Sequence, residues 1–363
     1  MNNIFTINEN LRIFDNGSDE IRLRIGIWNY NEAVLDLNGQ TDGFKSSIRD
    51  LFVKMQSGKG IDQNDIEGYS ISRDDKNSVM GLLEGLTSAG MVCKEEDRKV
   101  SNQIVQSLLG DYKYYVRPDN NKAFTEPDRK VIFISDSDYC KKTAVHLSGS
   151  MELKLDLISD ELYKDISVVD LTTRVDAFNT ISNIEKLKKD FEGYSTILVC
   201  MHRVKISLLR NINRIALALE KNVVVSFIDG PFITAFSINP SKTGCIECFE
   251  QRALSRMEDH VSYHNFINTK INESKEENKG VIPILNMLAN IVISEGYLIN
   301  NLGASKFEGR ILSIYVPSLE IQVDDILRVP FCPACGTVAK ADFAEMNISS
   351  RRLVDDIVSK IMR

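Results

Sequence analysis

The sequence predicts an α/β protein in two parts, a small winged-helix-like α+β region followed by a larger Rossmann-type region with a four-cysteine zinc site. Three observations support this prediction. Short apolar runs give way to helical spacing before residue 95. From residue 131 onwards, apolar strands alternate with amphipathic helices, which is typical of a mostly parallel sheet. Two Cys-x-x-Cys pairs follow, far apart in the chain.

Composition sets the broad class. The chain has 363 residues, of which 43% are hydrophobic and 26% charged, as in an ordinary globular protein of two or three domains. The N-terminus lacks a basic segment followed by an apolar run, and we expect no stretch of membrane-spanning length. The sequence therefore predicts a cytoplasmic protein without a membrane partner. A formal net charge of −7 argues against a nucleic-acid partner.

The first region, residues 1–95, begins with strands and ends with helices. Short apolar runs broken by Asn-rich and Gly turns predict strands at residues 11–14, 21–28 and 32–37. Apolar residues three and four positions apart then predict a helix, a short helical turn and a last helix, at residues 44–55, 62–69 and 79–91. Ser72, followed closely by two aspartates, supplies an N-cap for the last helix. This order of elements is winged-helix-like.

Winged helices often bind DNA, but the charge of this region argues against DNA. Residues 1–95 hold ten Lys and Arg against fifteen Asp and Glu, and Asp74, Asp75 and Glu84 lie on the last helix. Such a surface repels phosphates. The same arrangement can instead bind a peptide as an added strand at the sheet edge, with the peptide's side chains packed against the last helix.

A charged, irregular segment at residues 96–130 reads as a linker before the second region, residues 131–363. Apolar runs in the second region predict strands at residues 131–134, 153–158, 167–171, 195–200, 222–228 and 233–238. Helical spacing predicts helices after the first strand, up to residue 147, and at residues 208–219. This alternation implies a Rossmann-type sheet.

Cys245, Cys248, Cys332 and Cys335 form the two Cys-x-x-Cys knuckles. Two such pairs supply the four sulfurs that a structural zinc ion accepts, and the ion would tie a returning C-terminal segment to a folded body. Two disulfides, or chance spacing, are the alternatives, but a cytosolic chain favours metal. We expect the remaining cysteines to be buried structural thiols, at positions 93, 140 and 200.

The strand, helix, strand and Gly-Cys-Ile-Glu-Cys-Phe-Glu-Gln-Arg run at residues 194–252 resembles the ThiF-type, ubiquitin-activating-like adenylation fold. An apolar helix at residues 286–301 and the closing knuckle continue the resemblance. Active members place a Gly-rich turn after the first strand, but this chain has Ser-Asp-Ser-Asp at residues 135–138. His202 follows Met201 where such members place a magnesium-binding aspartate, and it is either a catalytic group or a hydrogen-bonded structural residue. These departures predict a fold that has lost nucleotide chemistry.

An acidic peptide clamp fused to a degenerate ThiF-like domain is similar to one group in particular, the leader-peptide-binding "Ocin-ThiF-like" component of azoline-forming cyclodehydratases. The resemblance implies an N-terminal PqqD-like element that captures the leader of a precursor peptide. A separate YcaO protein then uses ATP to cyclise the core, and a flavin-dependent dehydrogenase is a further partner that the resemblance allows. It also implies that this chain does no chemistry but raises the local concentration of the substrate.

For the leader, we expect an added strand along residues 33–37, which are Ala33, Val34, Leu35, Asp36 and Leu37. The groove for the leader's side chains would be lined by four apolar residues of the last helix, Val79, Leu82, Leu83 and Leu86. The alternative is that these four form the small domain's own core.

Two other functions stay open, an active adenylating enzyme and a zinc-containing winged-helix regulator. The Ser-Asp-Ser-Asp turn argues against the first and the acidic region against the second. Residues 281–302 carry more apolar residues than one helix face needs, which predicts either a homodimer interface or a core helix. The polar segment at residues 268–279 is expected to be mobile.

Overall fold

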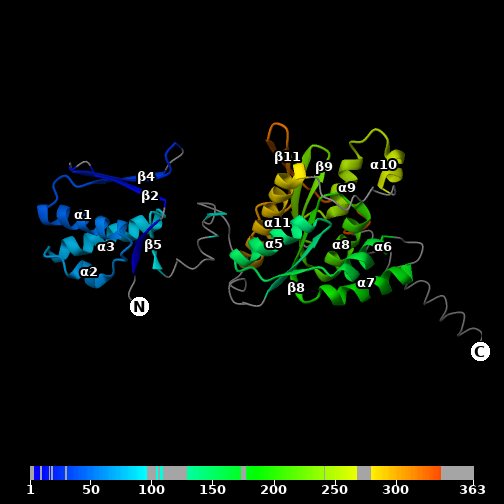
Figure 1. Ribbon diagram of the computed structural model, residues 1–363, viewed down its shortest axis with the longest axis horizontal. Coiled ribbons are helices and arrows are strands. Elements are labelled where there is room, and N and C mark those ends of the chain that lie inside the picture. The colour runs from blue at the N-terminus through cyan, green and yellow to red at the C-terminus, as the bar shows by residue number, and fades with distance from the viewer. Residues whose placement is uncertain are drawn as a thin grey trace, which may run out of the picture. The chain divides into compact units, whose positions relative to one another are not determined.

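The computed structural model describes residues 4–95 except 9, 16, 18, 29 and 30, residues 104, 107 and 108, and residues 129–336 except 173–176, 241 and 268–278. The chain divides into two compact units, Met1–Gly110 and Asp111–Arg363 (Figure 1). Each unit has its own core and is described by itself. The predicted linker and the segment predicted to be mobile fall almost entirely outside the described residues.

The first unit combines an antiparallel sheet with helices in the order that the sequence predicts. Its strands are β2 (Leu11–Asp15), β3 (Glu20–Ile25) and β4 (Asn31–Asp36), with β3 in the centre. Its helices include α1 (Asp42–Gln56), α2 (Gln63–Glu67) and α3 (Arg73–Ser88). A second small sheet pairs β1 (Phe5–Ile7) with β5 (Val92–Lys94). The sequence analysis did not predict it, because three-residue strands are too short to show a period.

Side-chain hydrogen bonds cap the amino ends of two of these helices, α1 and α3. The hydroxyl of Thr41 accepts the N–H of Phe44 at 3.2 Å, and the hydroxyl of Ser72 accepts the N–H of Asp75 at 3.1 Å. One core then joins the helices to the inner face of the three-stranded sheet. Its members include Ile21, Leu23, Ile48, Leu51, Phe52, Val79 and Leu83.

The second unit is built on a seven-stranded sheet in the order β12-β11-β10-β9-β8-β6-β7. The parallel part consists of β6 (Lys130–Ser135), β7 (Leu155–Leu157), β8 (Tyr194–Met201) and β9 (Asn222–Asp229). The antiparallel part consists of β10 (Phe232–Ile238), β11 (Arg310–Tyr315) and β12 (Glu320–Asp325). Because β7 and β8 lie on opposite sides of β6, the carboxyl ends of β6 and β8 form the topological switch point where α/β sheets bind ligands.

The predicted strand at residues 167–171 is wrong. Helix α6 (Asp160–Val168) occupies the first part of this stretch. The hydroxyl of Ser159 accepts the N–H of Leu162 at 3.2 Å, and acidic residues in the first turn favour a helix start here. Leu171 is buried in the core without belonging to a strand. The apolar run therefore combines the exposed Val168 at the end of a helix with the half-buried Val169 and the buried Leu171.

Helices cover both faces of the sheet. On one face, α6, α7 (Ala177–Phe191) and α8 (Ile206–Leu219) share a core with the strands. On the other face, α5 (Asp138–Ser150) packs against α11 (Ile282–Leu302), which follows the short 3-10 turn η3 (Lys279–Val281). Helices α9 (Ile246–Leu254) and α10 (His260–Ile267) follow β10 in the chain and precede η3.

Helix α11 is a core helix of its own unit. Together with η3 it is long and apolar enough to cross a membrane, so the expectation that no such stretch exists was wrong. It packs against α5 and against strands β8, β9 and β10. Its buried apolar residues include Leu285, Leu288, Ala289, Val292, Ile293 and Leu298. The core of one chain therefore accounts for these residues, and the homodimer stays a prediction.

Candidate functional site

The four cysteines of the two knuckles meet at one point in the second unit. Cys245 and Cys248 lie at the start of α9, and Cys332 and Cys335 lie on the segment that follows β12. All four Sγ atoms lie within 4.8 Å of one another, and all four cysteines are free of disulfides. The fold thus brings together the set that the sequence predicts.

The spacing of the sulfurs fits a tetrahedral cation. The Sγ of Cys245 lies 3.6 Å from that of Cys332 and 3.8 Å from that of Cys248, and the Sγ of Cys248 lies 3.3 Å from that of Cys335. Four thiolates bound about 2.3 Å from one zinc ion would lie about 3.8 Å apart. Because all four groups are thiols in a mostly buried cluster, the arrangement fits a closed structural metal site.

Neighbouring N–H groups support thiolates at this cluster. The amide of Asn213 donates to the Sγ of Cys245 at 3.6 Å, and the backbone N–H of Val329 donates to the Sγ of Cys248 at 3.3 Å. Hydrogen bonds from the Cys245 thiol and the other two cysteines lower the pKa of Cys248. The contact with Cys245 likewise lowers the pKa of Cys332, to about 7. Contacts with the neighbouring thiols instead raise the pKa of Cys245 and Cys335, so a cation that binds all four sulfurs would have to displace protons from these two.

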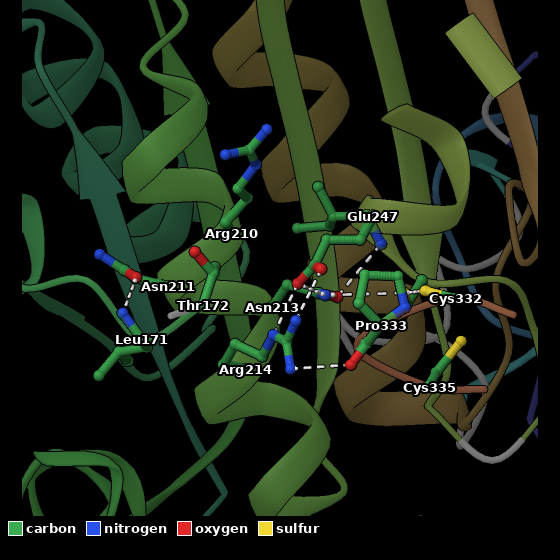
Figure 2. Close-up of polar contacts among 12 residues, drawn as sticks. Leu171, Thr172, Arg210, Asn211, Asn213, Arg214, Glu247, Cys332, Pro333 and Cys335 are labelled. Atoms are coloured by element: carbon green, nitrogen blue, oxygen red, sulfur yellow. Dashed lines mark hydrogen bonds and ion pairs between the residues drawn. The ribbon is translucent and has the colours of Figure 1, made fainter. Parts of the chain in front are cut away.

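Arg214 on α8 connects the two knuckles (Figure 2). Its Nε and Nη2 atoms donate to the carboxylate of Glu247 at 2.7 and 2.8 Å, and its Nη1 donates to the carbonyl of Pro333 at 3.0 Å. Glu247 lies between the cysteines of the first knuckle, and Pro333 between those of the second. The buried Glu247 also accepts from the amide of Asn213 at 3.2 Å. Helix α8 thus holds both knuckles in place through charge-assisted hydrogen bonds.

Sequence reasoning missed this brace. The available signal was Glu247 itself, an acidic residue enclosed by two buried cysteines, which needs a cationic partner if it is buried. The partner could not be found, because Arg214 is one of many basic residues and no local spacing relates it to the knuckle.

The turn after β6 is closed by its own side chains. The carboxylate of Asp136 accepts the backbone N–H groups of His202 and Arg203, at 2.7 and 3.0 Å. The hydroxyl of Ser137 accepts the N–H of Cys140 and so caps α5, at 3.0 Å. These amides lie at the switch point, where the backbone of such folds binds an anionic ligand. Here the chain's own oxygen atoms take that place, and His202 contributes a backbone N–H to it.

A cavity of about 890 Å³ lies beside the amino end of α8. Its walls include Phe227, Phe236 and Phe249, and they also include Glu250. The carboxylate of Glu250 accepts from the guanidinium of Arg210 at 2.9 Å and from the hydroxyl of Tyr263 at 2.6 Å. Burial, and then the Glu250 carboxylate, raise the pKa of Tyr263. The sequence analysis did not predict this cavity, because its walls come from separate strands and helices.

The residues predicted to bind a leader peptide divide into an edge strand and a buried set. Strand β4 is at the edge of its sheet, and on it Val34 and Asp36 are exposed while Ala33 and Leu35 pack against the core. Leu37 is buried. Of the four predicted groove residues, Leu82 is half-buried and three are buried in the unit's own core, Val79, Leu83 and Leu86. Those three therefore follow the core alternative that the sequence left open.

One hydrogen bond shows which N–H groups of β4 face β3 and which face away from it. The N–H of Leu37 donates to the carbonyl of Asp19 at 2.7 Å, towards β3. Because N–H groups alternate between the two sides of an antiparallel strand, Leu35 also directs its N–H towards β3, whereas Val34 and Asp36 direct theirs to the open edge.

In sequence, the chain matches no known family and no curated protein. In fold, it is similar to solved structures. A heterocyclase in complex with substrate and cofactor, and the heterocyclase TruD, each align with 92% of this chain at 13% identity and a TM-score of 0.54. The chain spans only 40% and 43% of those two proteins. E. coli MccB aligns with 92% of this chain and 97% of its own, at 12% identity and a TM-score of 0.50. A structure of MccB with ATP aligns in the same way, with a TM-score of 0.51. At this identity the likeness shows a shared fold.

Proposed function

We propose that this chain binds the leader of a ribosomally made precursor peptide and presents the core to a separate YcaO-type cyclodehydratase that forms thiazolines or oxazolines. The observation that carries the proposal is the partial fit to heterocyclases. This chain corresponds to about two fifths of those proteins, and in the proposal the YcaO-type protein provides the cyclising part. A flavin-dependent dehydrogenase that oxidises the rings would be a further partner.

The closed turn supports a non-catalytic role. The Asp136 carboxylate accepts the two backbone N–H groups after β8, and the Ser137 hydroxyl accepts one N–H in the first turn of α5, that of Cys140. An adenylating enzyme needs such amides for the phosphates of ATP. With these groups satisfied internally, the second unit serves as a scaffold, held by the Arg214 brace and by one structural zinc ion at the four cysteines. Free thiols suited to zinc are those of a reducing compartment, which favours the cytoplasm.

The leader would bind along β4 of the first unit, which we interpret as a PqqD-like, winged-helix-type element. Val34 and Asp36 offer outward N–H groups for an added strand, and Leu82 offers a half-buried apolar contact on α3. The buried Val79, Leu83 and Leu86 would support this surface from below rather than line it.

Binding of a labelled leader peptide to the full chain tests this assignment, using precursor peptides encoded near this protein's gene. Val34→Pro removes an outward N–H from an edge strand and should leave the pairing with β3 intact, so we expect about a tenfold loss of affinity. Phe14→Asp, an exposed position on the opposite edge strand β2, is the matched control and should bind normally. Unchanged binding by Val34→Pro would remove β4 from the proposal.

A second function is supported by one observation. MccB aligns over nearly its whole length, and one of its structures contains ATP. An adenylating enzyme would catalyse ATP–pyrophosphate exchange in the presence of its acyl substrate. We expect the isolated protein, with its precursor peptide, to show no exchange above that of a heat-treated sample. Exchange that requires the peptide would favour this second function over the first.

A further inference from the structure

Strand β12 forms an open edge of the seven-stranded sheet. It pairs with β11 on one side, and all six of its residues are exposed. Within the part of the chain that the structure describes, no strand pairs with its other side. The hairpin that β12 forms with β11 is drawn in orange in Figure 1. Open edges of this kind are ready to add a strand from another chain.

The apolar face of the sheet continues onto this edge, and among the described residues α11 covers it only in part. Cross-strand partners share a face, and one row runs from Ile233 on β10 through Ile314 on β11 to Ile321 on β12. Their exposed fractions are 0%, 6% and 67%. The next row, from Ala235 through Leu312 to Val323, gives 0%, 9% and 51%. Helix α11 covers this face as far as β10, so the last two apolar side chains extend beyond it.

The backbone of β12 presents its free hydrogen-bonding groups at the same residues. The N–H of Ile326 donates to the carbonyl of Gly309 at 2.6 Å, which fixes the alternation along the strand. In the register of β11 and β12, the backbones of Glu320, Gln322 and Asp324 then bond to β11, whereas Ile321 and Val323 direct N–H and C=O groups to the open side. An added strand would therefore meet backbone partners and an apolar face together.

The negative charge of β12 favours a basic partner strand. This strand carries three carboxylates, those of Glu320, Asp324 and Asp325. Among the described residues, Arg310 forms an ion pair with Asp325, at 3.9 Å. A second copy that paired residue 321 with residue 323 would place Glu320 opposite Asp324 twice, and like charges opposite each other destabilise a sheet. A strand with basic residues at alternate positions has no such conflict.

From these observations we propose that β12 is a docking edge for an extended segment of a partner protein in which apolar and basic residues alternate. The segment adds an eighth strand beside β12. Its apolar side chains cover Ile321 and Val323, and its basic side chains lie over Glu320 and Asp324. This surface lies in the second unit and is separate from the leader site proposed on β4, so it does not depend on that proposal.

A labelled peptide of about ten residues with alternating valine and lysine is the probe, and fluorescence anisotropy with the full chain measures its binding. We expect saturable binding that is at least about tenfold weaker for the same peptide with glutamate in place of lysine. Val323→Pro removes an outward N–H without breaking a bond to β11, and should also weaken binding about tenfold. Glu320→Lys with Asp324→Lys should reverse the preference in favour of the glutamate peptide.

The controls separate a docking edge from general attraction to an acidic protein. Val168→Asp places a charge at another exposed apolar residue, on α6, and should leave binding unchanged. Hydrogen exchange should show protection of Ile321 and Val323 when the lysine peptide is bound. Equal binding of both peptides, no saturable binding, or normal binding by Val323→Pro would each overturn the proposal. So would a dimer of the free protein that Val323→Pro dissociates, because β12 would then bind a second copy.

Discussion

Removing the Asp136 carboxylate should destabilise the second unit more than any other change in the turn after β6. This side chain accepts two backbone N–H groups, from His202 at 2.7 Å and from Arg203 at 3.0 Å. In Asp136→Ala both donors lose their partner, and the end of β8 loses its connection to the end of β6. The neighbouring Asp138 is exposed and forms one ion pair, with Lys141 at 3.6 Å, so Asp138→Ala is the matched control.

The magnitude follows from these contacts. A hydrogen bond to a charged group contributes about 1.5–3 kcal/mol, and because Asp136 is only half-buried, water can replace part of each bond. The lower end applies, so we expect Asp136→Ala to cost about 3 kcal/mol in total. Asp136→Asn keeps one acceptor oxygen and should cost about half of that. Asp138→Ala should cost less than about 1 kcal/mol, as expected for an exposed ion pair near a helix start.

Thermal unfolding of the full chain measures these differences, with the second unit followed as its own transition. For a unit of this size, about 3 kcal/mol corresponds to a fall in Tm of roughly 6–12 °C. Millimolar inorganic phosphate should restore more stability to Asp136→Ala than to the wild-type protein, because the vacated N–H groups can bind an external anion. Equal Tm values for Asp136→Ala and Asp138→Ala would refute the assignment of Asp136 as an internal anion.

Three further predictions concern the metal cluster, its brace and a buried acid. Metal analysis of freshly purified protein should find about one zinc ion per chain, and Cys332→Ser with Cys335→Ser should lose it together with several kcal/mol of stability, roughly as for other structural zinc sites. Arg214→Met should lower stability by about 3–5 kcal/mol, because it leaves the buried Glu247 carboxylate without its cation, whereas Arg310→Met at an exposed pair should change stability by less than about 1 kcal/mol in the same urea titration. Burial raises the pKa of Glu295 above its usual 4.5, so the contribution of this side chain to stability should be fully present below about pH 4.5 and lost as the pH rises through the raised pKa. Glu295→Gln removes this contribution, so the difference in Tm between the wild-type protein and Glu295→Gln should change over that pH range, and a constant difference would contradict the prediction.

The sequence predicted those parts of the structure that depend on local pattern. The buried strands β6, β8, β9 and β10 are continuous apolar runs, and helix α8 shows a clear helical spacing, so their type could be read directly. The cysteine spacing identified the four-cysteine cluster for the same reason, since a knuckle is a local motif.

The predictions from sequence fail where tertiary contacts, rather than local pattern, determine the structure. The apolar residues at 167–171 do not form a strand, because a capped helix extends to Val168 and Leu171 is buried in the core beyond it. The β11–β12 hairpin was not predicted, because β12 alternates over only two apolar residues, Ile321 and Val323, and is exposed on both faces, so the pattern is too short to indicate a strand. Val79, Leu83 and Leu86 show how a helical stripe identifies a face without telling whether its own chain or a partner covers it.

The contacts of Asp136 bear on the proposed role of the second unit as a scaffold that needs no nucleotide. A helix start and a strand end that bind an external anion leave N–H groups unsatisfied when the anion is absent, and unsatisfied buried N–H groups destabilise the surrounding backbone. In this chain the Asp136 carboxylate accepts the N–H groups of His202 and Arg203, and the Ser137 hydroxyl accepts that of Cys140, so these three groups need no external anion. The second unit should therefore keep one arrangement of β6, β8 and α5 whether or not ATP is present. A component that presents a peptide to a separate enzyme needs such ligand-independent rigidity, because any displacement of the scaffold would lower the effective concentration of the substrate at its partner.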